Sequence, residues 1–149
     1  MNLMMLLEMA TSGFGEREAV KSGGASLTYA QLFEAAGAAA GEIAESGCER
    51  VALLDVSSLA VPVGLFASAW AGLPFVPLNY RLTGAELERL LEEIAPSYLV
   101  TDGERAEALS KLPGTTVVSR EQFLERAIAG SAGDPSWPMD PDQIAILLF

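Results

Sequence analysis

The sequence predicts an α/β fold, with a mostly parallel sheet that carries helices on both faces. Short apolar runs alternate along the chain with segments of helical hydrophobic spacing, and this order requires right-handed crossovers between parallel strands. The run VALLDV, 51–56, is apolar at successive positions, as in a strand covered on both faces. At 149 residues, the chain is long enough for one core.

The first third of the chain predicts a helix, a hairpin and a second helix. MNLMMLLEMA indicates a short amphipathic helix, and 19–28 indicates two short strands around a Ser-Gly-Gly turn, because glycine accepts positive φ. Thr28 and Gln31 form a capping-box pattern that begins the next helix. Gly47 is placed to end that helix as its C′ residue.

After the strand at 51–56, Ser57 and Ser58 can cap a helix over 59–71. That helix has no charged residue, so we expect it to be enclosed on most sides. PFVPLN, 74–79, predicts the next strand, whose pairing is limited because Pro77 cannot donate to a ladder.

Thr83 and Glu86 form a second capping-box pattern, before a helix that Pro96 ends. Its apolar face consists of Leu87, Leu90, Leu91 and Ile94. The remaining predicted elements are a strand at 98–101, a helix at 103–111, a strand at 115–119, a helix at 119–129, a Gly/Pro/Ser-rich loop at 130–143 and an apolar strand at 143–149.

The terminal run, QIAILLF, is typical of a central strand and stops without a turn or polar residue. We therefore expect residues 1–149 to form a single, incomplete α/β subdomain.

Charge and composition exclude several classes of partner. Nine basic and 20 acidic residues give a net charge of −11, which repels nucleic acid and anionic lipid. The chain has no histidine for catalysis or metal binding, and the single Cys48 cannot form an internal disulfide. The amino terminus lacks the basic head of a signal peptide, and proline and glycine interrupt the apolar stretch 56–80, so we expect no membrane span and a cytoplasmic location.

No carboxylate pair stands out as catalytic, and we expect no catalytic residue and no metal site in this chain. Asp55, Ser57 and Ser58 lie at the carboxyl end of a predicted central strand, where open α/β sheets place ligands, although a serine before a helix is usually a cap. The acidic residues of the predicted helices are typical of solvated surface, where Arg89 is spaced to pair with Glu92 or Glu93.

Arg81 is the one candidate binding residue. It follows Asn79 and Tyr80 in the turn before a capped helix, within an acidic chain, and its guanidinium could contact a phosphate. The alternative, which is the more common role of such an arginine, is a pair with a nearby carboxylate or with carbonyls of the turn.

Four phrases in order carry a family resemblance, and they cover almost the whole chain. They are LTY at Leu27–Tyr29, RVALLDVSS at Arg50–Ser58, AGLPFVPLNYRLTGAEL at Ala71–Leu87 and SYLVTD at Ser97–Asp102. Together they resemble the amino-terminal portion of the adenylate-forming, AMP-dependent acyl-CoA synthetase/ligase family. LNYRLTGAEL is similar to CoA ligases rather than to the Asp-Pro-x-Tyr-Pro wording common in peptide-synthetase adenylation domains.

The resemblance implies the first subdomain of the large amino-terminal domain of such an enzyme. The full-length parent would use ATP, Mg²⁺ and coenzyme A to convert a fatty acid or other carboxylic acid to acyl-AMP and then to acyl-CoA. The family's phosphate loop and later catalytic groups lie beyond these residues, so we expect the fragment alone to be inactive, with no cofactor of its own. The resemblance also implies that Arg81 reaches the phosphate end of coenzyme A.

The expected partner is the remaining, carboxyl-terminal part of the same polypeptide, and exposed apolar surface would also allow a homodimer. One alternative is a free-standing, non-catalytic α/β binding or scaffold module of the same fold. Another is an unrelated flavodoxin-like domain, which bound flavin would reveal.

Overall fold

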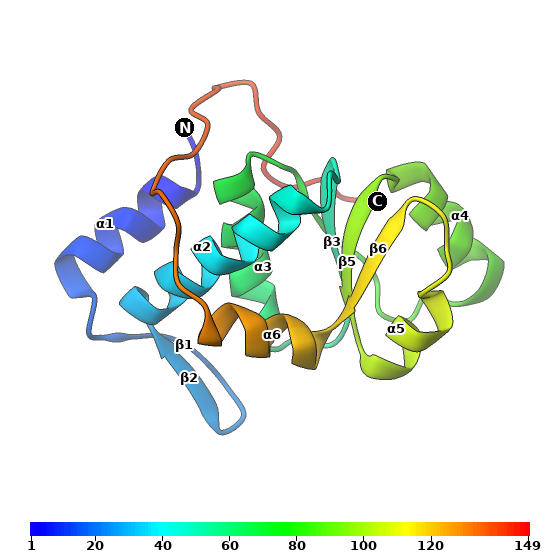
Figure 1. The fold of residues 1–149 in the computed structure, drawn as a ribbon, viewed down its shortest axis with the longest axis horizontal. Coiled ribbons are helices and arrows are strands. Elements are labelled where there is room, and N and C mark those ends of the chain that lie inside the picture. Colours follow the sequence, from blue (N-terminus) through cyan, green and yellow to red (C-terminus); the bar gives the residue numbers. More distant parts are fainter.

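The computed structural model describes residues 1–149 and confirms the predicted fold class (Figure 1). Six helices and six strands follow one another in the order α1 (Met4–Phe14), β1 (Glu18–Ser22), β2 (Ala25–Thr28), α2 (Tyr29–Glu45), β3 (Arg50–Leu54), α3 (Ala60–Ala71), β4 (Phe75–Pro77), α4 (Gly84–Ile94), β5 (Ser97–Thr101), α5 (Gly103–Leu109), β6 (Thr115–Ser119) and α6 (Arg120–Ala129).

Four of the strands form a parallel sheet in the order β4-β3-β5-β6. β1 and β2 form a separate antiparallel hairpin, as the Ser-Gly-Gly turn predicts. None of the helices is both long and apolar enough to span a bilayer.

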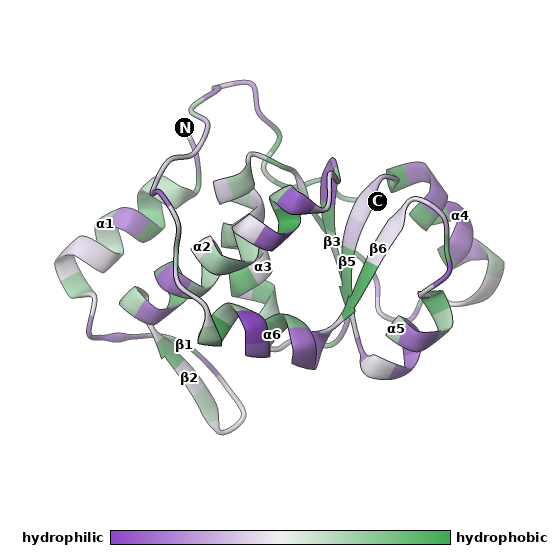
Figure 2. Ribbon diagram, in the orientation of Figure 1, coloured by the Kyte–Doolittle hydropathy of each residue, from purple (hydrophilic) through white to green (hydrophobic).

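Alternate residues of the strands enter two different cores, which explains why the strands are apolar at successive positions. Val51 and Leu53 of β3 pack in a larger core with α1, α2, α3 and α6. Ala52 and Leu54 pack in a smaller core with α4 and α5. The uncharged helix α3 is largely buried, as predicted, and Figure 2 shows hydrophilic residues gathered on α4 and α6.

The capping predictions divide into two outcomes. At α2 the complete box forms: the Thr28 side chain accepts the Gln31 N–H at 3.1 Å, and the Gln31 side chain accepts the Thr28 N–H at 2.9 Å. At α4 the predicted box is wrong, because Thr83 is the N-cap but its side chain accepts no hydrogen bond. Gly84 directly after it has a φ of +62°, a left-handed conformation at the position where a capping box requires a helical residue.

The run 143–149 does not form the central strand that its hydrophobicity predicts. It lies at the outer edge of the sheet, where a single parallel bridge joins Ile146 to Phe75. The Phe75 N–H donates to Ala145, and the Phe75 carbonyl accepts from Leu147. Pro77, the next residue of β4 on that side, has no N–H, so the ladder stops there. Ile146, at 47% exposure, and its neighbours Ile144 and Leu148 therefore remain open.

Residues 130–143, here called the strap, contain no helix or strand but are packed against the domain. In Figure 1 the strap is the orange and red segment that runs from α6 across α2 towards the amino terminus. Trp137 of the strap lies 5.3 Å from Trp70 and 6.3 Å from Phe33, measured between ring centroids. The side-chain N–H₂ of buried Asn2 donates to the carbonyls of Ala69 and Pro138, each at 2.9 Å. The strap is therefore held by both aromatic and polar contacts.

Candidate functional site

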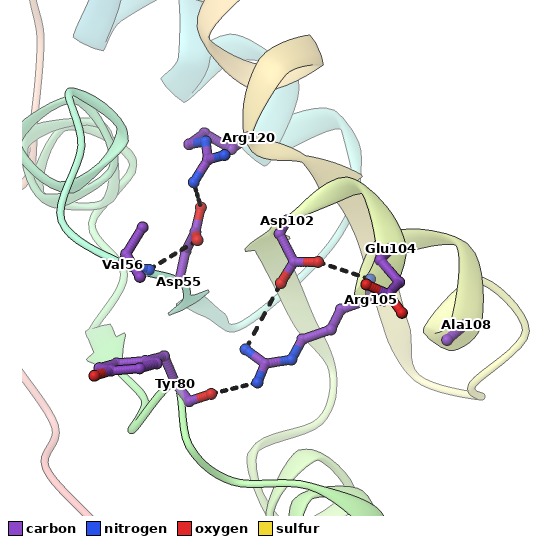
Figure 3. A pocket seen from close by; sticks show the side chains of 8 residues that line it. All are labelled: Asp55, Val56, Tyr80, Asp102, Glu104, Arg105, Ala108 and Arg120. Atoms are coloured by element: carbon purple, nitrogen blue, oxygen red, sulfur yellow. Dashed lines mark hydrogen bonds and ion pairs between the residues drawn. The ribbon is translucent and has the colours of Figure 1, made fainter. Parts of the chain in front are cut away.

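A cleft of about 620 Å³ opens at the carboxyl edge of the parallel sheet (Figure 3). Its lining comes from the segments that follow β3, β4, β5 and β6, which the parallel arrangement brings to one edge. Open α/β sheets bind ligands outside this edge. The lining residues are Asp55, Val56, Tyr80, Asp102, Glu104, Arg105, Ala108 and Arg120.

Asp55, directly after β3, is the buried charge of the cleft. Its side chain is 4% exposed and pairs through Oδ2 with Nη1 of Arg120 at 2.6 Å. Arg120 begins α6 and also pairs with exposed Glu121 at 3.0 Å. Partial burial on its own lowers the pKa of Arg120, but the Glu121 hydrogen bond and the Asp55 charge outweigh it and raise the pKa overall. Asp55 is thus a structural partner of α6, with its oxygens already engaged.

Asp102, directly after β5, organises the opposite wall. Its Oδ1 accepts the Arg105 backbone N–H at 3.0 Å and so caps α5, while Oδ2 lies 3.7 Å from the Arg105 guanidinium. The other guanidinium nitrogen of Arg105 donates to the backbone carbonyl of Tyr80 (Figure 3). Arg105 therefore joins the end of β5 to the turn that follows β4.

Arg81 lies on that turn, next to Tyr80, and is exposed. Its guanidinium carbon is 5.7 Å from the centroid of the Tyr80 ring. Its backbone N–H donates to the Asn79 side chain at 3.0 Å. The guanidinium makes no ion pair and no hydrogen bond to a turn carbonyl, so the alternative role considered from the sequence is absent here.

The other sequence candidates have local roles. The N-cap of α3 is Leu59 and not a serine, while Ser58, one residue earlier, accepts the Ala60 N–H at 3.1 Å. Ser57 is exposed, and Arg89 forms neither of the ion pairs that its spacing allows. No group of three His, Cys, Asp or Glu residues is arranged to hold a metal ion.

A second polar cluster lies away from the cleft, between α2, β5 and α6. The Tyr98 hydroxyl donates to Glu42 at 3.2 Å, and Arg126 lies 3.8 Å from the same carboxylate. Burial, reinforced by the negative charge of Glu42, raises the pKa of Tyr98 well above its ordinary value. The cluster keeps Tyr98 neutral and ties β5 to α2.

Arg105, Arg120 and Asp102 are the residues of the cleft that the sequence candidates omitted. Asp102 and Arg120 directly follow the predicted strands at 98–101 and 115–119, Arg105 lies in the helix after Asp102, and Asp55 lies at the carboxyl end of 51–56. Listing every charged residue at the carboxyl end of a parallel strand, or directly after it, would have placed Asp55, Asp102 and Arg120 together, because all these strand ends share one edge. It would have missed Arg105, which lies within α5. Their pairing, in contrast, depends on side-chain directions that spacing does not give.

Comparison with known proteins gives a consistent set of relatives. A family model described as AMP-binding enzyme matches residues 7–149. A feruloyl-CoA synthase from Amycolatopsis sp is 33% identical over 139 residues, which is 88% of this chain and 27% of that protein. Surfactin synthase subunit 3 from Bacillus subtilis is 29% identical over 85% of this chain and 10% of its own length. The chain thus spans about a quarter of the length of the feruloyl-CoA synthases that it matches.

Solved structures share the fold. A benzoate CoA ligase from Burkholderia xenovorans LB400 superposes with a TM-score of 0.84 and 21% identity, over 98% of this chain and 32% of that one. A fatty acyl CoA synthetase of Mycobacterium tuberculosis gives 0.79 and 20% identity, over 99% of this chain and 32% of that one.

Proposed function

Because this chain belongs to the AMP-binding enzyme family, we propose that it forms the amino-terminal part of an acid–CoA ligase. The whole enzyme joins a carboxylic acid to AMP with release of pyrophosphate, and then transfers the acyl group to the thiol of coenzyme A. Mg²⁺ supplies positive charge at the phosphates in such a reaction. The observation that carries the proposal is the family match over residues 7–149, together with the 33% identity to a feruloyl-CoA synthase.

The role proposed for these 149 residues is to build one sheet of the enzyme and to bind part of coenzyme A. The sequence contains no Gly-rich loop ending in lysine of the kind that holds ATP phosphates. Four charged residues of the cleft are paired, Asp55 with Arg120 and Asp102 with Arg105, and exposed Glu104 has no basic partner. We therefore assign no catalytic residue to this chain, and we propose that it has no acid-activating activity by itself.

Arg81 is the proposed contact to a phosphate of coenzyme A. It is exposed, it has no carboxylate partner, and it lies beside the carboxyl edge of the sheet. An unpaired guanidinium offers several donors in a fork that fits phosphate oxygens. The surrounding chain is acidic, so the exposed guanidinium of Arg81 is not part of a general positive surface.

The remainder of the same polypeptide is the proposed partner of the apolar edge formed by Ile144, Ile146 and Leu148. These side chains are about half exposed or more, and the parallel bridge at Phe75 gives a following strand its register. A second copy of the chain is the other proposed occupant. We propose a cytoplasmic location, from the reducing setting that fits a single unpaired cysteine.

The substrate is proposed to be a fatty acid or another carboxylic acid. Feruloyl-CoA synthases act, by name, on an aromatic acid, so the test panel should include ferulate and benzoate beside fatty acids of several lengths. The polypeptide encoded by the complete reading frame is assayed for acid-dependent exchange of pyrophosphate into ATP, and for a CoA thioester detected by mass spectrometry. Residues 1–149 alone are the matched control and should show neither reaction.

We expect both reactions from the complete protein with at least one acid, and a raised KM for coenzyme A in the Arg81→Ala variant. A folded complete protein that is inactive with every acid would contradict the ligase proposal and favour the non-catalytic module. Transfer of the acyl group to a carrier protein, with none to coenzyme A, would favour a peptide-synthetase role instead.

A further inference from the structure

We propose that Arg105 is a positioning residue for coenzyme A: it holds the turn that carries Arg81 at the carboxyl edge of the sheet. This inference rests on the proposed function, because it assumes that Arg81 meets the phosphate end of coenzyme A. It adds a second arginine with a different task, which the sequence did not single out.

The first observation is the connection that Arg105 makes. Its guanidinium donates to the Tyr80 carbonyl, which is 25 residues away along the chain (Figure 3). The Tyr80–Arg81 turn follows the edge strand β4, while Arg105 lies in the first turn of α5. A single side chain therefore spans the cleft between two elements that do not follow each other in sequence.

The second observation is that the turn has little other support. Its remaining backbone hydrogen bonds are local: the Arg81 N–H donates to the Asn79 side chain, and the Leu82 N–H donates to the Asn79 carbonyl, each at 3.0 Å. No other hydrogen bond ties residues 79–82 to a distant part of the chain. Without Arg105, the position of the turn depends on these local bonds, on the packing of Leu82 and on the preceding residue, Leu78, which is buried and whose N–H donates to the Leu53 carbonyl at 2.9 Å.

The third observation is a division of roles between the two arginines. Arg105 is 26% exposed and is occupied by Asp102 and by the Tyr80 carbonyl. Arg81 is exposed and is steadied only by the Tyr80 ring. The guanidinium of Arg105 already has partners within the protein, whereas the guanidinium of Arg81 keeps its N–H donors available for a ligand. A phosphate contact gains affinity when the donor is held in place before binding, because less conformational entropy is lost.

Asp102 holds Arg105 in position through both of its carboxylate oxygens. One of its oxygens caps α5 through the Arg105 N–H at 3.0 Å, and the other faces the Arg105 guanidinium at 3.7 Å. The chain of contacts therefore runs from the end of β5 through Asp102 and Arg105 to the Tyr80 carbonyl, and from there to Arg81.

The experiment compares R81A, R105A, R105K and the double variant R81A/R105A in the complete enzyme. KM is measured for coenzyme A and for pantetheine, which lacks the phosphates, and pyrophosphate exchange reports the first reaction separately. R126A serves as a control, because Arg126 is 54% exposed and pairs with Glu42 outside the cleft. Thermal melting of each variant identifies any loss of folding, and R105K retains the charge if R105A is unstable.

For R105A we expect KM for coenzyme A to rise about fivefold to tenfold, which is less than the loss of more than tenfold expected when a charge-assisted hydrogen bond is removed outright, because Arg81 itself remains. KM for pantetheine and the rate of pyrophosphate exchange should change by less than about twofold, because the effect passes only through a phosphate contact. R105K should lie between R105A and wild type, R126A should match wild type, and R81A/R105A should be no worse than R81A, since both changes remove the same interaction.

The outcomes separate the two proposals. If the wild-type enzyme forms no CoA thioester, the proposed function and this inference both fail. If the wild type is active and R81A raises KM for coenzyme A, but folded R105A and R105K do not, only the role of Arg105 is overturned. Additive effects in the double variant, or an equal rise for pantetheine, would likewise overturn it, because Arg105 would then act independently of Arg81.

Discussion

Asp55 and Arg120 join the end of β3 to the start of α6 through a contact of 2.6 Å. β3 is an inner strand of the sheet, and α6 is one of the helices that cover the larger core. With only 4% of its side chain exposed, Asp55 has few other ways to be solvated. The pair therefore fixes the position of α6 over the sheet edge at which the cleft opens.

Removing Arg120, the partner of Asp55, should lower the stability of the protein. We predict that Arg120→Ala lowers the free energy of unfolding by about 2 kcal/mol, because a buried carboxylate loses a charged hydrogen-bond partner. Arg126→Ala is the matched control, since its pair with Glu42 is much more exposed, and it should cost less than about 1 kcal/mol. Urea denaturation of both variants gives the comparison. Equal losses of unfolding free energy in the two variants would show that the Asp55–Arg120 pair stabilises the protein no more than the exposed Arg126–Glu42 pair does.

Two glycines of α2 offer a sharp test of how the strap is held. A Cβ on Gly37 would lie 2.5 Å from the Cβ of Ala132 and 2.9 Å from the ring of Trp70. A Cβ on Gly41 meets nothing within 4 Å. We predict that Gly37→Ala destabilises the protein by about 1–3 kcal/mol through overpacking and shifts tryptophan fluorescence. Gly41→Ala should stabilise it by about 0.5–1 kcal/mol. If Gly37→Ala stabilised the protein, the strap would have to move aside without cost to make room for the added methyl group.

Thr28 and Thr83 are both N-cap residues, but only the Thr28 side chain makes a capping hydrogen bond. Thr28→Ala removes a formed capping box at α2, and we predict a loss of about 1 kcal/mol. Thr83→Ala removes a side chain that makes no capping hydrogen bond at α4, so its effect should stay within about 0.5 kcal/mol. Chemical denaturation measures both. A similar cost at both positions would indicate that the Thr83 hydroxyl does cap α4 in solution.

Tyr98 predicts a dependence of stability on alkaline pH. Its pKa is raised in the folded protein above the ordinary value of 10.0, first by burial and then by the Glu42 charge. The folded state therefore holds the proton more tightly than the unfolded state, and this contribution is complete below pH 10.0 and lost as the pH rises through the folded pKa. Tyr98→Phe should cost about 1 kcal/mol at neutral pH, from its lost hydrogen bond.

The measurement is the free energy of unfolding of both proteins between neutral and alkaline pH. Above pH 10.0 wild type should lose stability faster than the phenylalanine variant, so the difference between them should narrow. Other groups that titrate in both proteins contribute equally to the two free energies of unfolding, so their contributions cancel in the difference. Parallel curves would show that Tyr98 ionises as readily in the folded protein as in the unfolded one.

Much of the fold was predictable because hydrophobic period and capping residues act locally. The alternation of strand and helix, the parallel sheet covered on both faces and the complete cap of α2 are all confirmed. The family resemblance carried by the phrases around Ala71–Leu87 is also confirmed, by the match over residues 7–149. These features depend on residues close together in sequence.

The predictions that failed depend on distant partners or on backbone direction. The run 143–149 is apolar enough for a central strand, but Pro77 cannot continue its ladder at the edge of β4. The positive φ of Gly84 undoes the second capping box. Similarly, no spacing rule joins Arg105 to the Tyr80 carbonyl, so the assembly of the cleft could be seen only in three dimensions.

The hydrogen bonds of Asn2 have a consequence for the order of events during synthesis. One of its two carbonyl partners, Pro138, is made 136 residues later. Until Pro138 leaves the ribosome, the side-chain amide of Asn2 cannot donate to its carbonyl, so one of the contacts that hold the start of α1 is not yet formed. Final docking of α1 is therefore a late step in biogenesis, although its residues emerge long before the strap.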